Sequence, residues 1–245
     1  MTLDRREIVA MEFPAVPATV WKHLRDPELV RRWYRWDAPD LDEHVAAFVA
    51  GTEGHDAAGR HTLTWPNHDV LTLGPAGGHP EITHLSVTRR SHEVAGFDGV
   101  YDYADAIWVA GAEQLRFAVT VQPGQPRRTL SVFGLDAGDR RERLLDRAGL
   151  HGVRGIPVGS NVQARRPDGT LLGGTLLHKS DELLVLHVHG ITAALLVLVE
   201  TPAASAPPHG TVGAVMSTYG LDDETFAQVE SRWSDWWRMA GARPR

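Results

Sequence analysis

The sequence contains no cysteine among its 245 residues. This absence excludes disulfide frameworks, thiolate zinc sites and cysteine nucleophiles together. Any metal ligand or nucleophile in this protein must therefore come from another residue type, and the 13 histidines are a rich supply of candidates.

Long apolar runs are also missing. The most apolar stretch, Ile191 to Val199, is far shorter than the ~20 residues that a membrane-spanning helix needs. The N-terminal segment Met1 to Glu7 is charged and lacks the apolar core of a secretory signal. We therefore expect no membrane association and a cytoplasmic location.

The chain has no excess of basic residues, because 25 Lys and Arg stand against 31 Asp and Glu for a formal net charge of −6. A nucleic-acid binder normally carries a basic surface that neutralises phosphates. Arginine pairs such as Arg165 and Arg166 are diluted by acidic neighbours and are interpreted as solvated surface charge. We expect no nucleic-acid partner.

The residues that are present describe an ordinary globular chain, 42% hydrophobic and 23% charged. Its length suits two compact cores better than one. The segment Gln122 to Pro126 contains two prolines and a glycine and cannot continue a helix, so it is interpreted as a linker. The expected domains are residues 1–122 and 127–245.

The first half opens with an alternating strand, Glu7 to Phe13, followed by a short helix from Pro17 to about Arg25. Asp26 is placed to cap a second helix, in which Leu29 and Trp33 lie four apart on the buried face. From Leu41 to Ser91 the pattern changes, and we expect antiparallel strands with no helix. Three runs of this region stand out, namely His61–Trp65 and Val70–Leu73, joined as a hairpin, and Ile82–Thr88.

A third helix is predicted from about Gly99 to Val119, because apolar residues recur there at spacings of three and four. These positions are Tyr101, Ala104, Ile107, Trp108, Gly111, Leu115 and Ala118. A long amphipathic helix after an antiparallel sheet must bury its apolar stripe, and the face of the sheet is the available partner.

The early residues Val20, Trp21, Leu24, Asp26, Pro27, Glu28 and Trp33 follow an opening strand. In this arrangement the first half of the chain resembles the START-like (SRPBCC) superfamily, in particular its branch named after activators of the heat-shock-protein ATPase. The helix from Gly99 resembles the closing helix of that branch. The resemblance implies a curved sheet that grips a helix around an apolar cavity. The run of strands is short for this family, so the cavity is expected to be small, filled by side chains, or absent.

The second half repeats the same order of elements. A strand at Thr129–Phe133 and a helix at Asp139–Ala148, stopped by Gly149, precede a series of strands. The strands are expected at Asn161–Arg165, Thr170–Leu177, Leu183–His189, Ala194–Val199 and Val212–Ser217. The run Ala194–Val199 is apolar on both faces and is therefore predicted to be central.

The final helix is marked by Asp222 as its cap and by an apolar stripe of Phe226, Val229, Trp233, Trp236 and Trp237. Its tryptophans can fill a core or seal the two domains together. The predicted fold class is α+β, a helix-grip (START-like) antiparallel sheet wrapped on a long C-terminal helix, present twice.

Histidine offers the best candidate for metal or acid–base chemistry. His187 and His189 lie two apart on one strand and share a face, with His178 across the preceding turn as a third ligand. Since no carboxylate lies at a ligand spacing, we predict no metal site. The sequence also has no hydrolase serine motif and no phosphate-binding loop. We therefore assign no catalytic residue and no cofactor.

Aromatic residues are the more informative set, because large rings supply the apolar wall of a ligand site. The predicted ligand-binding residues are Trp33, Trp36, Trp65, Tyr101, Trp108, His187 and His189. For any one of these side chains, packing in the core is the competing interpretation.

Three functions remain in competition. The leading hypothesis is binding or carriage of a small hydrophobic molecule. The second is a polyketide cyclase or aromatase in which His84, Tyr101 or Arg89 positions a flexible substrate. The third is a protein-interaction module like the activators of the chaperone ATPase. A homodimer is compatible with each of them.

Overall fold

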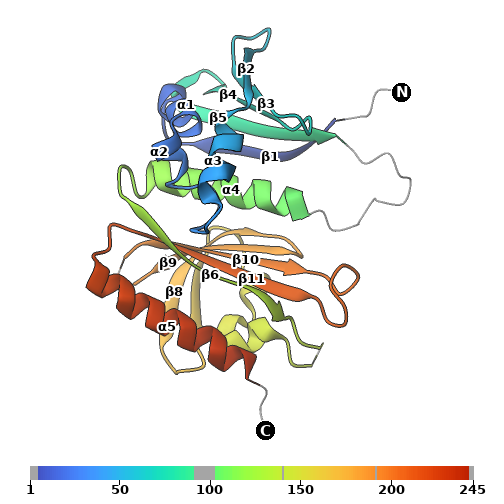
Figure 1. Ribbon diagram of the computed structural model, residues 1–245, viewed down its shortest axis with the longest axis vertical. Helices are drawn as coiled ribbons and strands as arrows, with labels where there is room; N and C mark the ends of the chain where they lie inside the picture. The colour runs from blue at the N-terminus through green and yellow to red at the C-terminus, as the bar shows by residue number, and fades with distance from the viewer. Residues whose placement is uncertain (1–4, 91–102, 140, 191, 243–245) are drawn as a thin grey trace. The chain divides into compact units, whose positions relative to one another are not determined.

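The computed structural model describes residues 5–90, 103–139, 141–190 and 192–242. The chain divides into two compact units, Met1–Gln125 and Pro126–Arg245 (Figure 1). In the described ranges no helix is both long and apolar enough to cross a bilayer.

Unit 1 contains a five-stranded antiparallel sheet with the strand order β1-β5-β4-β3-β2. Its strands are β1 (Arg5–Phe13), β2 (Thr52–His55), β3 (His61–Thr64), β4 (Val70–Ala76) and β5 (His79–Arg90). The hairpin predicted across Pro66 and Asn67 joins β3 to β4, and the strands predicted at Glu7–Phe13 and Ile82–Thr88 are confirmed.

Three short helices follow β1 in unit 1, namely α1 (Pro17–Arg25), α2 (Pro27–Val30) and α3 (Leu41–Val49). Asp26 caps α2 as predicted, because its side chain accepts the backbone N–H of Glu28 at 3.0 Å. The prediction that this helix continues to Trp33 was wrong. The chain turns instead and passes through Arg35, whose φ of 52° lies in the left-handed region and is incompatible with helix.

Helix α3 corrects the expectation that residues from Leu41 onward form only strands. Its buried residues Leu41, Val45 and Phe48 are spaced by four and three, which is the helical period. Asp42 in the first turn suits the positive end of the helix dipole. The helical pattern was present in the sequence, but the prediction gave more weight to the turn residues around it.

The long helix α4 (Tyr103–Thr120) packs against β1 and α1 of unit 1 (Figure 1). Its described part agrees with the predicted helix from Tyr103 onward, and the predicted first residues, 99–102, lie outside the described residues. Leu115 and Ala118, which belong to the predicted apolar stripe, are buried.

Unit 2 contains a six-stranded antiparallel sheet with the strand order β6-β11-β10-β9-β8-β7. The strands are β6 (Arg127–Asp136), β7 (Asn161–Arg165), β8 (Leu171–Lys179), β9 (Leu183–His189), β10 (Ala194–Thr201) and β11 (Thr211–Tyr219). Strand β10 lies inside the sheet, as predicted. Its neighbouring residues Leu195 and Leu196, which point to opposite faces, are both 0% exposed.

The helix predicted at Asp139–Ala148 was largely wrong. In the described residues the helical segments here are residues 144–150, where Leu144 and Leu145 are buried as predicted, and a single turn at Val153–Gly155. Asp139 closes a local turn by accepting backbone N–H groups of the residues that follow it, which competes with helix formation. Gly149 breaks the helical conformation near the end of this segment, with φ 83°, and a Cβ at this position would lie 1.8 Å from the carbonyl oxygen of Arg165.

Helix α5 (Asp223–Gly241) lies against the unit 2 sheet (Figure 1). Its cap is confirmed, because Asp222 accepts the backbone N–H of Thr225 at 2.7 Å. Trp233, Trp236 and Trp237 belong to the hydrophobic core of unit 2, which confirms the first of the two interpretations given for them.

The two units repeat one topology. In each sheet the first strand pairs antiparallel with the last strand, the other strands then follow in reverse chain order, and a long helix comes after the last strand. Each pairing of first and last strands also contains a register shift. The predicted α+β helix-grip class is confirmed, and the arrangement occurs twice.

Candidate functional site

The candidate site lies in unit 1, where the first turns of α4 meet one end of the sheet. The pairing of β1 with β5 changes register at this end of the sheet. Glu7 pairs with Thr88 whereas Val9 pairs with Val87, which leaves Ile8 as an extra residue. The extra residue moves Arg6 to the sheet face that carries Val9. Without it, Arg6 would point away from α4.

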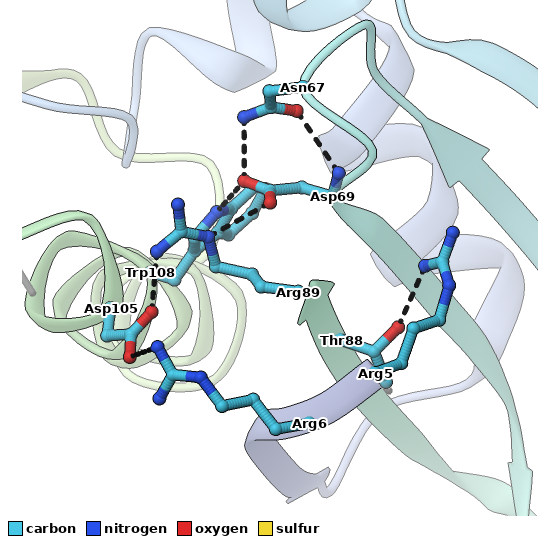
Figure 2. A network of polar contacts seen from close by, with 8 residues as sticks. All are labelled: Arg5, Arg6, Asn67, Asp69, Thr88, Arg89, Asp105 and Trp108. Carbon is cyan, nitrogen blue, oxygen red and sulfur yellow. Dashed lines mark hydrogen bonds and ion pairs between the residues drawn. The ribbon is translucent and has the colours of Figure 1, made fainter. Parts of the chain in front are cut away.

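Asp69, immediately before β4, is the centre of a polar network (Figure 2). Its Oδ1 accepts the Nε–H of Arg89 at 2.9 Å, and its Oδ2 accepts the Nε1–H of Trp108 at 2.8 Å. Asn67 donates a third hydrogen bond to Oδ2 at 2.8 Å and accepts the backbone N–H of Asp69 at 3.1 Å. Asp69 is 3% exposed, and its hydrogen bonds compensate for its burial.

The network continues to the edge strand. Arg89 donates from its second guanidinium nitrogen to Asp105 Oδ1 at 2.6 Å, and Arg6 forms an ion pair with Asp105 Oδ2 (Figure 2). We call Asp69, Arg89, Asp105 and Arg6 the ion-pair row. Its charges alternate and cancel, so the row contributes no net charge to the sheet end. It ties α4, through Asp105 and Trp108, to three strands or their flanking loops.

A group of aromatic rings lies beside the ion-pair row. We call Phe48, Trp65 and Trp108 the aromatic wall; they come from α3, the loop after β3 and α4. Their ring centroids are separated by 5.2 Å for Phe48 and Trp65, 5.3 Å for Trp65 and Trp108, and 6.4 Å for Phe48 and Trp108. Trp33 packs edge-on against Phe48 at 5.2 Å.

The indole N–H groups in this region all point to internal acceptors. Trp65 donates to the carbonyl oxygen of Phe48 at 2.9 Å, Trp108 donates to Asp69, and Trp33 donates to the carbonyl oxygen of His23 at 2.9 Å. Trp33 is 2% exposed and belongs to the core. Trp65 and Trp108 are only partly buried, and each is anchored by its N–H group.

The structure brings together three of the predicted ligand-binding residues, Trp33, Trp65 and Trp108. Trp36 is partly buried, and the guanidinium of Arg35 lies 5.9 Å from its ring centroid. Tyr101 lies outside the described residues.

His187 and His189 lie in unit 2, with ring centroids 4.5 Å apart. They alternate along β9 with Leu186 and Val188, which belong to the core under α5, so the two histidines lie on the opposite face of the sheet. Burial, and to a lesser extent the charge of His189, lowers the pKa of His187.

His178 does not join this pair, because it lies opposite Val185 whereas Thr175 lies opposite His187. Across the described part of the chain, no three His, Asp or Glu side chains are placed to hold a metal ion together.

Of the polar residues proposed for a cyclase, Arg89 is on the face of the sheet that α4 covers, whereas His84 is not. His84 alternates with Leu85, which is 1% exposed, and therefore points to the other face. Sequence reasoning missed Asp69, Asp105 and Arg6. The only local signal was the loop Asn67 to Asp69, whose side chains are typical of a tight turn.

Comparison of the sequence with models of known protein families and with curated proteins finds no match. Among solved structures the protein is similar to the di-domain ARO/CYC BexL of the BE-7585A biosynthetic pathway, at 12% identity over 99% of this chain and 100% of that chain, with a TM-score of 0.35. The di-domain ARO/CYC StfQ of the steffimycin pathway is 14% identical, with 95% and 96% coverage and a TM-score of 0.33. XoxI from Bacillus cereus is 15% identical over 47% of this chain and 92% of its own, with a TM-score of 0.30.

These identities and TM-scores are too low to carry an argument about activity. The fold class therefore stands on the strand order and helix placement of this protein. The narrower resemblance to activators of the heat-shock-protein ATPase stays a prediction.

Proposed function

We propose that unit 1 binds a small, flat, hydrophobic molecule against the aromatic wall. One observation carries the proposal: the N–H groups of Trp65 and Trp108 are engaged by internal acceptors, while neither residue is fully buried. Whatever part of these rings is accessible is therefore apolar surface held in a fixed orientation.

A fixed ring favours binding because little side-chain freedom is lost when a ligand arrives. Trp65 is held especially closely. A Cβ at Gly51 would lie 2.9 Å from its Nε1, so the indole packs directly on the backbone that follows α3. Trp108 is held by Asp69 of the ion-pair row. In this proposal the row is a positioning device and takes no part in chemistry.

The proposal is tested with a neutral naphthylamine probe, whose emission rises in an apolar site and which accepts energy from tryptophan. Trp65→Leu should weaken probe binding at least tenfold. Trp21→Leu is the matched control, since Trp21 is also a partly buried indole of unit 1 but belongs to α1 and stacks on His61. Equal binding by both variants would contradict the site.

Two further variants separate loss of the site from loss of the fold. Trp65→Phe keeps an aromatic ring and removes the N–H anchor, and Gly51→Ala displaces the indole without removing it. Both variants should bind the probe more weakly while their circular dichroism spectra stay like that of the wild type. Native mass spectrometry of the freshly purified protein then reports a retained ligand. A retained molecule that the protein converts on incubation would favour the cyclase hypothesis over carriage.

A further inference from the structure

Two histidines meet at the edge of the unit 1 sheet, at the opposite end of the β3–β4 hairpin from Asp69. His55 of β2 and His61 of β3 are directly opposite each other in the antiparallel ladder. Their ring centroids are 4.8 Å apart and their planes are inclined by 52°. His55 is exposed and His61 is partly buried, so solvent reaches the pair.

The imidazole nitrogens of this pair are not committed to other groups. Neither the His55 nor the His61 imidazole has a hydrogen bond or an ion pair with the described part of the chain; the ring contacts are with each other and, for His61, with Trp21. In four other histidines a ring nitrogen contacts an acceptor: His23 with Thr19, His44 with Asp40, His79 with Glu81 and His209 with Asp136.

The separation of the two rings suits one shared metal ion. With metal–nitrogen bonds of about 2.0 to 2.1 Å, each ring centroid lies about 3 Å from the metal, and two ligands about 100° apart then have centroids about 5 Å apart. The observed 4.8 Å matches this value without movement of the strands. The backbone ladder fixes the two Cα atoms, and Trp21 restrains one ring by stacking on His61 at 4.5 Å and 21°.

The two carboxylates nearest to the histidine pair in sequence are already engaged by arginines. Glu53, two residues before His55 and on the same face of β2, is paired with Arg25 at 2.6 Å. Asp56, the next residue after His55, is paired with Arg60 and also accepts backbone N–H groups. Neither carboxylate is needed as a ligand if the two imidazoles bind the ion together with water.

We propose that His55 and His61 form a binding site for a late first-row divalent cation, with water completing the coordination. Imidazole is a ligand that suits Cu²⁺, Ni²⁺ and Zn²⁺, and affinity for a given nitrogen site rises toward Cu²⁺. The site should therefore bind Cu²⁺ more tightly than Ni²⁺ or Zn²⁺. It is independent of the aromatic wall and of the function proposed for it.

Trp21 supplies the readout, because Cu²⁺ bound at His61 lies beside its indole and quenches its fluorescence. The full-length protein is titrated with Cu²⁺, and Trp21→Phe should abolish the saturable part of the quenching while the affinity measured by calorimetry stays unchanged. His55→Ala and His61→Ala should each weaken binding at least tenfold. His79→Ala, an exposed histidine of the same sheet, is the matched control and should leave the affinity as it was.

The second histidine pair of the protein needs its own control. A His187→Ala, His189→Ala double variant should leave the Trp21 quenching intact. Electron paramagnetic resonance of the Cu²⁺ form should show two coordinated imidazoles in the wild type and one in His55→Ala. Unchanged affinity in a His55→Ala, His61→Ala double variant with native circular dichroism would overturn the site, as would undiminished quenching in Trp21→Phe.

Discussion

Helix α4 is joined to the unit 1 sheet through charged side chains near its start in addition to buried apolar residues such as Leu115, whereas α5 is joined to the unit 2 sheet mainly through three tryptophans. In unit 2, Trp236 and Trp237 stack at 4.9 Å and 20°, and Trp233 packs edge-on against both. The topology is the same in the two units. The long helix that follows the last strand of a helix-grip fold can therefore be attached to its sheet by very different side chains.

The two attachments differ in what they specify. Stacked tryptophans gain stability from the area they bury, and this gain depends weakly on direction. The ion-pair row must first offset the desolvation of its charges, and it does so only when every hydrogen bond is made. We infer that the row fixes the position of Trp108 in the aromatic wall, whereas the tryptophans of α5 mainly supply stability to unit 2.

The largest effect is expected from removing the central tryptophan of unit 2. Trp236→Ala should destabilise unit 2 by about 3 to 5 kcal/mol, the usual range for emptying a buried aromatic site. The variant also loses the hydrogen bond from Trp236 Nε1 to the carbonyl oxygen of Ala148, 2.8 Å long. Urea unfolding gives the measurement. Trp237→Phe, which loses no such hydrogen bond, should cost clearly less than Trp236→Phe.

A comparable effect is expected when the ion-pair row is broken at its centre. Asp69→Ala leaves Arg89 and the Trp108 N–H without their buried acceptor, which costs about 3 to 5 kcal/mol in typical proteins. Asp42→Ala is the control, because Asp42 pairs with Arg31 at the surface and is 74% exposed. If both variants unfold at the wild-type urea concentration, the row contributes nothing to stability.

A smaller difference should separate two glycines of unit 2. Gly149 and Gly152 both have left-handed φ, at 83° and 75°. Gly152→Ala should cost only about 1 to 2 kcal/mol of backbone strain, since nothing lies within 4 Å of the added Cβ. Gly149→Ala should cost more, because its Cβ meets the carbonyl oxygen of Arg165. Equal midpoints of thermal unfolding for the two variants would mean that the segment around Gly149 can move away from β7 at no cost in stability.

The sequence predicted those structural features that are determined by residues close together in the chain. The cap of α5 at Asp222 and the hairpin that joins His61–Trp65 to Val70–Leu73 were found because their signals are local. The ion-pair row could not be found in this way. Arg6, Asp69 and Arg89 are distant in sequence, and they share a face only because one extra residue shifts the register of β1.

The aromatic wall was predicted in part for the same reason. Trp108 followed from helical periodicity, and Trp65 from its place at the end of a strand. Phe48 was missed because its segment was expected to be a strand, although Leu41, Val45 and Phe48 carry the helical period. In that region local turn signals outweighed a short helical pattern, which nine residues support only weakly.

The smallest effect concerns the cap of α5 and its response to acid. The backbone N–H of Thr225 holds the pKa of Asp222 below its usual range. The stabilisation by the carboxylate is therefore fully present above the pKa of an unfolded aspartate, about 3.9, and is lost as the pH falls through the lower folded value. Asp222→Asn keeps an acceptor without a charge. The gap in Tm between wild type and variant should narrow below about pH 4; a constant gap would contradict this role of the charge.

The most direct test of the difference between the two attachments is hydrogen exchange along the two long helices in Asp69→Ala. If the ion-pair row holds α4 in place, amides of Tyr103–Thr120 lose protection in this variant while amides of Asp223–Gly241 keep theirs. Wild-type protection along α4 in Asp69→Ala would show that the charged residues do not hold this helix, and the role of the row in positioning Trp108 would then be wrong.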